Sequence, residues 1–174
     1  KILGRAIGAN RDKVQILSKV FSNHLKAQQV VGACDRSLKN LGTDYLDLYQ
    51  IHSATLDSGV LDNQAVLGEL ARLRDRGLCI GLSLSGPKQS DTLRKAMAIE
   101  FGGRLLFGAV QATWNVLEPS AGAALQEASG AGIGVIVKEA LANGRLTPRN
   151  NRPDFASQRR LLDVMARELG VGID

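Results

Sequence analysis

The chain has 174 residues, a formal net charge of +5, 44% hydrophobic residues and 22% charged residues. This length and composition are typical of one globular domain with a substantial core. No apolar run approaches the roughly 20 residues that a membrane span needs, and we expect no signal peptide because Lys1 to Arg11 lacks an apolar stretch. The basic residues are scattered among acidic ones, so the charge predicts no nucleic-acid-binding surface.

The few cysteines and histidines restrict the possible chemistry. Cys34 and Cys79 lie in apolar patterns, which favours buried, reduced thiols and a cytoplasmic protein. No cysteine and histidine cluster has the spacing of metal ligands, so no metal site is predicted. The chain has only two histidines, His24 and His52, so histidine chemistry must use one of them.

In chain order, short apolar segments alternate with amphipathic helices. We expect Ser90 to cap one helix and Gly42 to end another. Successive strands recur about every 30 residues, the length of a strand–helix–strand unit. The predicted strands are Val14–Lys19, Tyr45–Ile51, Cys79–Ser83, Phe107–Thr113 and Ile133–Val137. The predicted helices are His24–Leu41, Asn63–Arg76, Asp91–Glu100, Ala121–Ser129 and Phe155–Leu169.

This alternation predicts an α/β fold with parallel strands and right-handed crossovers. Both an open doubly wound sheet and a closed barrel fit it. An open sheet that binds a dinucleotide would carry G-x-G-x-x-G directly after a strand. The glycine cluster Gly130 to Gly134 comes before a strand instead, and we interpret it as a tight turn between a helix and a strand.

Polar side chains lie at or near the C-terminal end of every predicted strand. In a barrel these strand ends converge on one mouth, where active sites lie. The pattern therefore favours a barrel-mouth site over simple strand termination. The residues concerned are Lys19, His52, Ser83, Gln111, Lys138 and Glu139.

Two of these residues are suited to acid–base work. The positive charge of Lys19 can lower the pKa of a neighbouring hydroxyl, although a lysine in this position can also simply lie in solvent. A neutral His52 can donate a hydrogen bond to a carbonyl oxygen, and the alternative is a histidine at the edge of the core that bonds to backbone. We assign no role to His24, which lies at the start of a predicted helix and not at the end of a strand.

The segment Leu41–His52, LGTDYLDLYQIH, resembles the signature of aldo-keto reductases. Other segments resemble the family in the same order, namely LGRAI, ILSKV, SLKNLG, LCIGLS, VQATWN and VIVKEALANGRL. The resemblance covers essentially the whole chain. It implies a (β/α)₈ TIM-type barrel and hydride transfer between NAD(P)H and a small-molecule carbonyl or alcohol, with NADPH expected and NADH possible.

The resemblance also implies catalytic roles. These enzymes use an Asp, Tyr, Lys and His tetrad, in which the tyrosine donates the proton and the histidine positions the carbonyl. Lys19 and His52 match the lysine and the histidine. The family aspartate and tyrosine precede the segment that resembles LGRAI, and Tyr45 and Tyr49 do not take their place.

Some of the implied cofactor-binding positions match the family residues, and others differ from them. Ser83 and Gln111 match residues that hold the nicotinamide carboxamide, whereas Leu84 stands where the family usually has asparagine. Lys138 occupies the position of a tyrosine that stacks on the nicotinamide ring. The cofactor-binding residues implied by the family are Ser83, Gln111, Lys138, Leu141 and Asn143, of which the last two belong to a pyrophosphate loop.

The resemblance places this chain in the middle of the family barrel, as its third to seventh strand–helix units. We expect residues 1–174 to form one incomplete barrel domain, because a closed barrel needs about 250 residues. The alternatives to an oxidoreductase are a cofactor-binding regulatory subunit and an inactive fragment without the catalytic tyrosine and aspartate. Substrate and oligomeric state stay open.

Overall fold

The computed structural model describes residues 1–22, 26–147, 150 and 152–170. His24 lies outside the described residues, and so does the start of the helix predicted from it. In the described part of the chain, no helix is long and apolar enough to cross a membrane, and no group of three or more His, Cys, Asp or Glu side chains is arranged to hold a metal ion.

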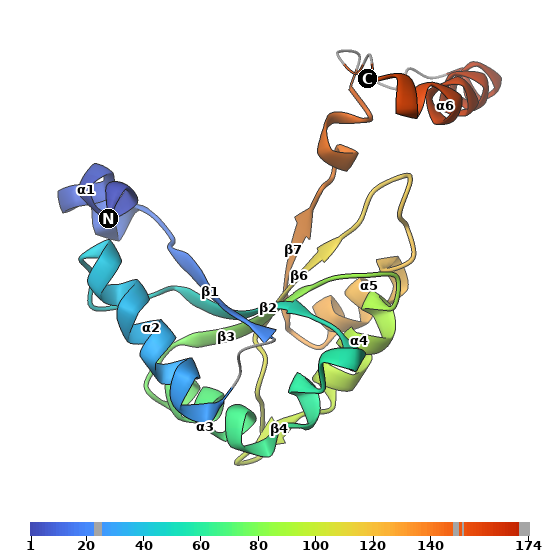
Figure 1. Ribbon diagram of the computed structural model, residues 1–174. Helices are drawn as coiled ribbons and strands as arrows, with labels where there is room; N and C mark the ends of the chain where they lie inside the picture. Colours follow the sequence, from blue (N-terminus) through green and yellow to red (C-terminus); the bar gives the residue numbers. More distant parts are fainter. Residues whose placement is uncertain (23–25, 148–149, 151, 171–174) are drawn as a thin grey trace.

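A five-stranded parallel sheet forms the centre of the fold (Figure 1), with the strand order β1-β2-β3-β6-β7. Its strands are β1 (Leu17–Phe21), β2 (Leu48–Ala54), β3 (Cys79–Leu84), β6 (Ala109–Thr113) and β7 (Gly134–Lys138). The helices are α1 (Ile2–Ile7), α2 (Ala27–Leu41), α3 (Gln64–Asp75), α4 (Gln89–Met97), α5 (Gly122–Gly130) and α6 (Ala156–Leu169). The predicted α/β class and parallel pairing are confirmed.

Among the described residues, helices cover one face of the sheet and leave the other face uncovered. Each strand of this sheet pairs with the next one along the chain, so right-handed crossovers bring the intervening helices to the same side. The Oγ atoms of Ser18 in β1 and Ser37 in α2 lie 2.8 Å apart, and the Tyr49 hydroxyl in β2 donates to the Val30 carbonyl in α2 over 2.9 Å. These contacts identify the outer face, which α2, α3, α4 and α5 cover (Figure 1).

The core lies between the outer face and these helices. Val30, Leu67 and Leu70 of the helices and Ile51 and Leu82 of the strands are all completely buried. Burying one such side chain contributes about 1.5–3 kcal/mol. This layer orients the sheet, because alternate residues of a strand must point to opposite faces. The intervening residues therefore line the inner face.

Several predicted boundaries are wrong by a few residues. The Asp91–Glu100 helix is instead α4, Gln89–Met97, and Lys88 rather than Ser90 holds its N-cap position. The Ser90 hydroxyl donates to the Ser120 carbonyl over 2.8 Å. A short antiparallel hairpin, β4 (Glu100–Phe101) with β5 (Arg104–Leu105), follows α4 and was not predicted. Gly42 does end α2, in the left-handed conformation with φ 70°.

Candidate active site

The inner face gathers five of the seven predicted site residues. Lys19 pairs in register with Gln50, and Phe21 pairs with His52. The register then continues across the sheet from Ser83 to Gln111 and from Thr113 to Lys138. Because these positions alternate with the outward-facing ones, their side chains share one face of the sheet. The five are Lys19, His52, Ser83, Gln111 and Lys138.

Strands β1, β2, β3 and β7 run past their predicted ends, which corrects the idea that β1, β2 and β3 end at the polar residues, whereas β6 ends at Thr113 as predicted. Strand β1 begins at Leu17, not Val14, and continues to Phe21, so Lys19 lies at its centre. Strand β2 continues past His52 to Ala54. The extra residues pair with neighbouring strands, as Phe21 does with His52, and backbone pairing outweighs the polarity of the side chains. Of the five site residues on the inner face, Lys138 alone is the last residue of its strand.

His52 occupies an irregular part of β2. The register between β2 and β3 shifts between Ile51 and Ala54, and Ser53 has φ 53°, a left-handed conformation that is uncommon for a residue with a side chain. Such irregularities often re-aim a side chain beside a functional site. The His52 ring stacks edge-on against Phe21 at 4.9 Å between centroids, and its Nδ1 lies 3.4 Å from the Ser53 hydroxyl.

The electrostatic surroundings favour a neutral imidazole. Burial lowers the pKa of His52, and the positive charges of Lys19 and Lys138 lower it further. The two lysines lie in the two edge strands of the sheet, on either side of β2, yet both act on the same ring. A neutral imidazole can donate one hydrogen bond and accept another. The inner face therefore combines two cations with a neutral hydrogen-bond donor.

This pKa shift predicts a pH dependence of folding stability. Because the folded-state pKa lies below 6.5, the unfolded chain binds more protons as the pH falls from about 6.5 to the folded value. Stability is therefore lost over that interval and is constant above it. We expect His52→Gln to remove this part of the acid sensitivity. The measurement is the difference between urea midpoints at pH 7.5 and pH 5 in both proteins, and an equal difference in the two would contradict the expectation.

Lys138 makes a contact across the mouth of the sheet. Its ammonium donates to the Leu84 carbonyl at the end of β3 over 2.8 Å. Leu141 and Asn143 follow β7, in or next to a short 3₁₀ turn, Ala142–Gly144, and both are exposed. Asn143 has φ 56°. These two predicted residues thus belong to an exposed turn after the sheet and not to its inner face.

Neither tyrosine of the chain reaches the inner face. Tyr49 is fully buried against α2, and burial raises the pKa of its hydroxyl far above the ordinary value. Tyr45 precedes β2 at the amino edge of the sheet, where its ring lies 3.7 Å from the Arg11 guanidinium carbon. Both positions agree with the expectation that neither tyrosine acts as the proton donor.

One residue of the inner face was missed. Gln50 is completely buried and pairs in register with Lys19. Its Nε2 donates to the Leu82 carbonyl over 3.3 Å, whereas its Oε1 has no hydrogen-bond partner among the described residues. A buried acceptor without a protein partner is uncommon, and a bound water, an ion or a catalytic role can account for it. The signal in the sequence was a glutamine inside the apolar strand that leads to His52.

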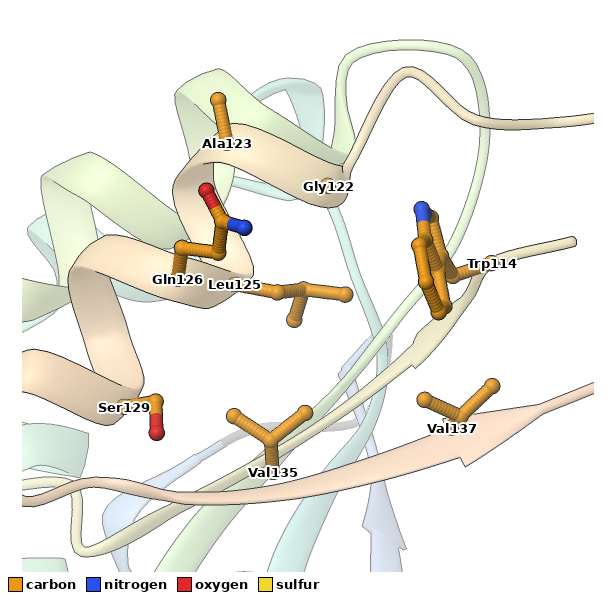
Figure 2. Close-up of a pocket in the computed structure, with 8 residues that line it drawn as sticks. All are labelled: Trp114, Gly122, Ala123, Leu125, Gln126, Ser129, Val135 and Val137. Atoms are coloured by element: carbon orange, nitrogen blue, oxygen red, sulfur yellow. The ribbon is translucent and has the colours of Figure 1, made fainter.

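A separate hollow lies on the opposite face of the sheet. Trp114, Leu125, Val135 and Val137 surround a space of about 480 Å³ between α5 and β7 (Figure 2). Val135 and Val137 alternate with Ile136 and Lys138, so they point outward. The lining contains no titratable side chain. We therefore assign the candidate site to the inner face and not to this hollow.

These features define an α/β protein of parallel-barrel type with lysine, histidine, serine and glutamine at one edge. The sequence profile of the Aldo/keto reductase family matches residues 1–168. The chain belongs to this family. A methylglyoxal reductase of Escherichia coli K12 is 44% identical over 52 residues, which are 30% of this chain and 18% of the relative. An aldo-keto reductase of Mycolicibacterium smegmatis is 33% identical over 95 residues, which are 52% of this chain and 34% of the relative.

Solved structures agree with the barrel architecture. An aldo-keto reductase from Pseudomonas aeruginosa aligns with 79% of this chain and 52% of its own, at 27% identity and a TM-score of 0.63. An aldo/keto reductase from Klebsiella pneumoniae, solved with NADP and acetate, aligns with 99% of this chain and 57% of its own, at 22% identity and a TM-score of 0.63. This chain thus spans about half the length of the solved relatives and supplies an incomplete barrel.

Proposed function

We propose that this chain supplies the lysine and the histidine of an NADPH-dependent oxidoreductase that interconverts small aldehydes or ketones with alcohols. The observation that carries the proposal is the shared inner face of Lys19 and His52, on which the charge of Lys19 lowers the pKa of the histidine. NADPH is proposed because the Klebsiella relative was solved with NADP. NADH remains compatible with the same site.

The residues at the carboxyl edge fit a nicotinamide carboxamide. That group offers an acceptor oxygen and two N–H donors, so it needs partners of both kinds. The Ser83 hydroxyl and the Gln111 amide lie in register on adjacent strands, and each can donate and accept. NADPH supplies the hydride when bound. We assign Ser83 and Gln111 to its carboxamide, and Leu141 and Asn143 to the loop beside its pyrophosphate.

His52 and Lys19 have distinct proposed roles. A neutral imidazole donates a hydrogen bond from one ring nitrogen to the substrate carbonyl oxygen, which orients the carbonyl and increases its polarity. The Lys19 ammonium provides a positive charge where negative charge develops on that oxygen, or on the hydroxyl that protonates it. Lys19 lies in β1 and His52 lies in β2, so the sheet itself holds them in position.

The same proposal includes a cytoplasmic location and a small-molecule substrate. Both cysteines are free, but only Cys34 is buried, whereas Cys79 is half-buried, which corrects the expectation that both are buried; burial raises the pKa of both thiols. Free, protonated thiols suit a reducing compartment.

The test uses the full-length protein as its source makes it. We expect NADPH to bind and its absorbance to fall when small aldehydes such as methylglyoxal or glyceraldehyde are added. Binding measured by calorimetry and turnover measured by absorbance are separate results. Binding without turnover would favour a regulatory, cofactor-binding subunit, and the absence of both would favour an inactive chain.

A further inference from the structure

Two positions that depart from the family pattern contact each other. By the family resemblance, Lys138 stands in the place of a stacking tyrosine and Leu84 in the place of an asparagine. The Lys138 ammonium donates to the Leu84 carbonyl over 2.8 Å. Lys138 is the last residue of β7 and Leu84 the last of β3, with β6 between them. The lysine side chain therefore spans the carboxyl end of β6, where Thr113 pairs with Lys138, on the face that also carries the pair Ser83 and Gln111.

This arrangement adds a fixed positive charge to the cofactor side of the site. The Lys138 side chain is half-buried, and its charge reaches His52 in β2, whose pKa it lowers. In the described part of the chain, no ion pair joins Lys138 or Lys19 to a carboxylate. The adjacent Glu139 is exposed, with φ 57°. The inner face thus holds two cations that are not neutralised by such pairing.

We propose that Lys138 makes the site discriminate between the two redox states of the nicotinamide cofactor, in favour of the reduced form. This inference rests on the proposed function, in which Ser83 and Gln111 hold the carboxamide of the ring. The oxidised ring carries a positive charge and the reduced ring carries none. A cation beside the ring therefore destabilises only the oxidised complex, whereas the phosphates are common to both forms and cancel in the ratio of the two affinities.

The expected size follows from Coulomb's law. Two unit charges about 6 Å apart, in surroundings between protein and water, repel each other enough to change an equilibrium about 10-fold. The hydrogen bond to Leu84 matters here because it holds the ammonium at the mouth. A free lysine would move into solvent and have a smaller effect.

The experiment measures the dissociation constants of NADPH and NADP⁺ by calorimetry in the full-length protein, at one ionic strength. The variants are Lys138→Met and Lys138→Gln, which remove the charge, and Lys138→Arg, which keeps it. Lys39→Met is the matched control, because Lys39 is an exposed lysine near the end of α2, at the opposite edge of the sheet. We expect the ratio of the NADP⁺ constant to the NADPH constant to fall about 10-fold in the two neutral variants only.

The possible outcomes distinguish a failure of this inference from a failure of the proposed function. If the neutral variants change both constants by the same factor, Lys138 contributes to binding alone and the inference is wrong, while the proposed function stands. If the wild-type protein binds neither form, the proposed function is wrong, and the inference that rests on it is wrong as well. Having two neutral variants of different polarity keeps the test valid if one of them fails to fold.

Discussion

Lys19→Met is expected to lower the rate of NADPH-dependent carbonyl reduction in the full-length protein by about 10²–10⁴-fold, the usual contribution of a group in acid–base catalysis. Methionine keeps the length of the side chain and removes its charge. Lys19 is exposed on the inner face and its backbone pairs with Gln50, so little packing is lost. The effect should therefore appear in kcat and not in folding stability, as measured by steady-state kinetics and urea unfolding.

A second readout of the same variant does not depend on activity. The positive charge of Lys19 lowers the pKa of His52, so its removal should raise that pKa toward the ordinary value of about 6.5. An NMR titration of the imidazole measures this shift, with His52→Gln to assign the signal. Lys39→Met should change neither the rate nor the titration. Unchanged kinetics in Lys19→Met would remove this residue from the mechanism.

Gly81→Ala is expected to have the largest effect on stability, with a loss of about 1–3 kcal/mol in the free energy of unfolding. Gly81 lies on the inner face, in register with Gln50 and Ala109. A Cβ atom there would lie 2.8 Å from the Ala109 carbonyl oxygen, 2.9 Å from Leu48 Cδ1 and 3.3 Å from Gln50 Cγ. The first of these neighbours is backbone, which cannot move without disturbing the pairing of β3 with β6.

The matched control is Gly68→Ala. Gly68 lies inside α3, and a Cβ atom there meets nothing within 4 Å. Alanine should therefore leave stability unchanged or raise it by about 0.5–1 kcal/mol, because it is the better helix former. Urea unfolding of both variants provides the comparison. Equal stabilities of Gly81→Ala and wild type would show that the sheet relaxes around the added methyl group.

The missed features have in common that no local sequence pattern signals them. Polarity suggested that β1 ends at Lys19, but the backbone of Phe21 still pairs with His52. The hairpin of β4 and β5 escaped prediction because each strand has only two residues, too few for a period of alternation. Gln50 was overlooked because a single polar residue in an apolar strand carries no periodic signal. Its burial depends on neighbours that are distant in the sequence.

The sequence by itself determined the order of the five strands of the main sheet and of the helices between them, the parallel class of that sheet and the membership of the family. These depend on hydrophobic periodicity and on motifs within single segments, which are local properties. Only the tertiary structure decided that Lys19 and Lys138, from opposite edges of the sheet, both act on His52, and that Lys138 bonds to Leu84. Such contacts join residues far apart in the chain, and they follow from strand register and packing, which no single segment encodes.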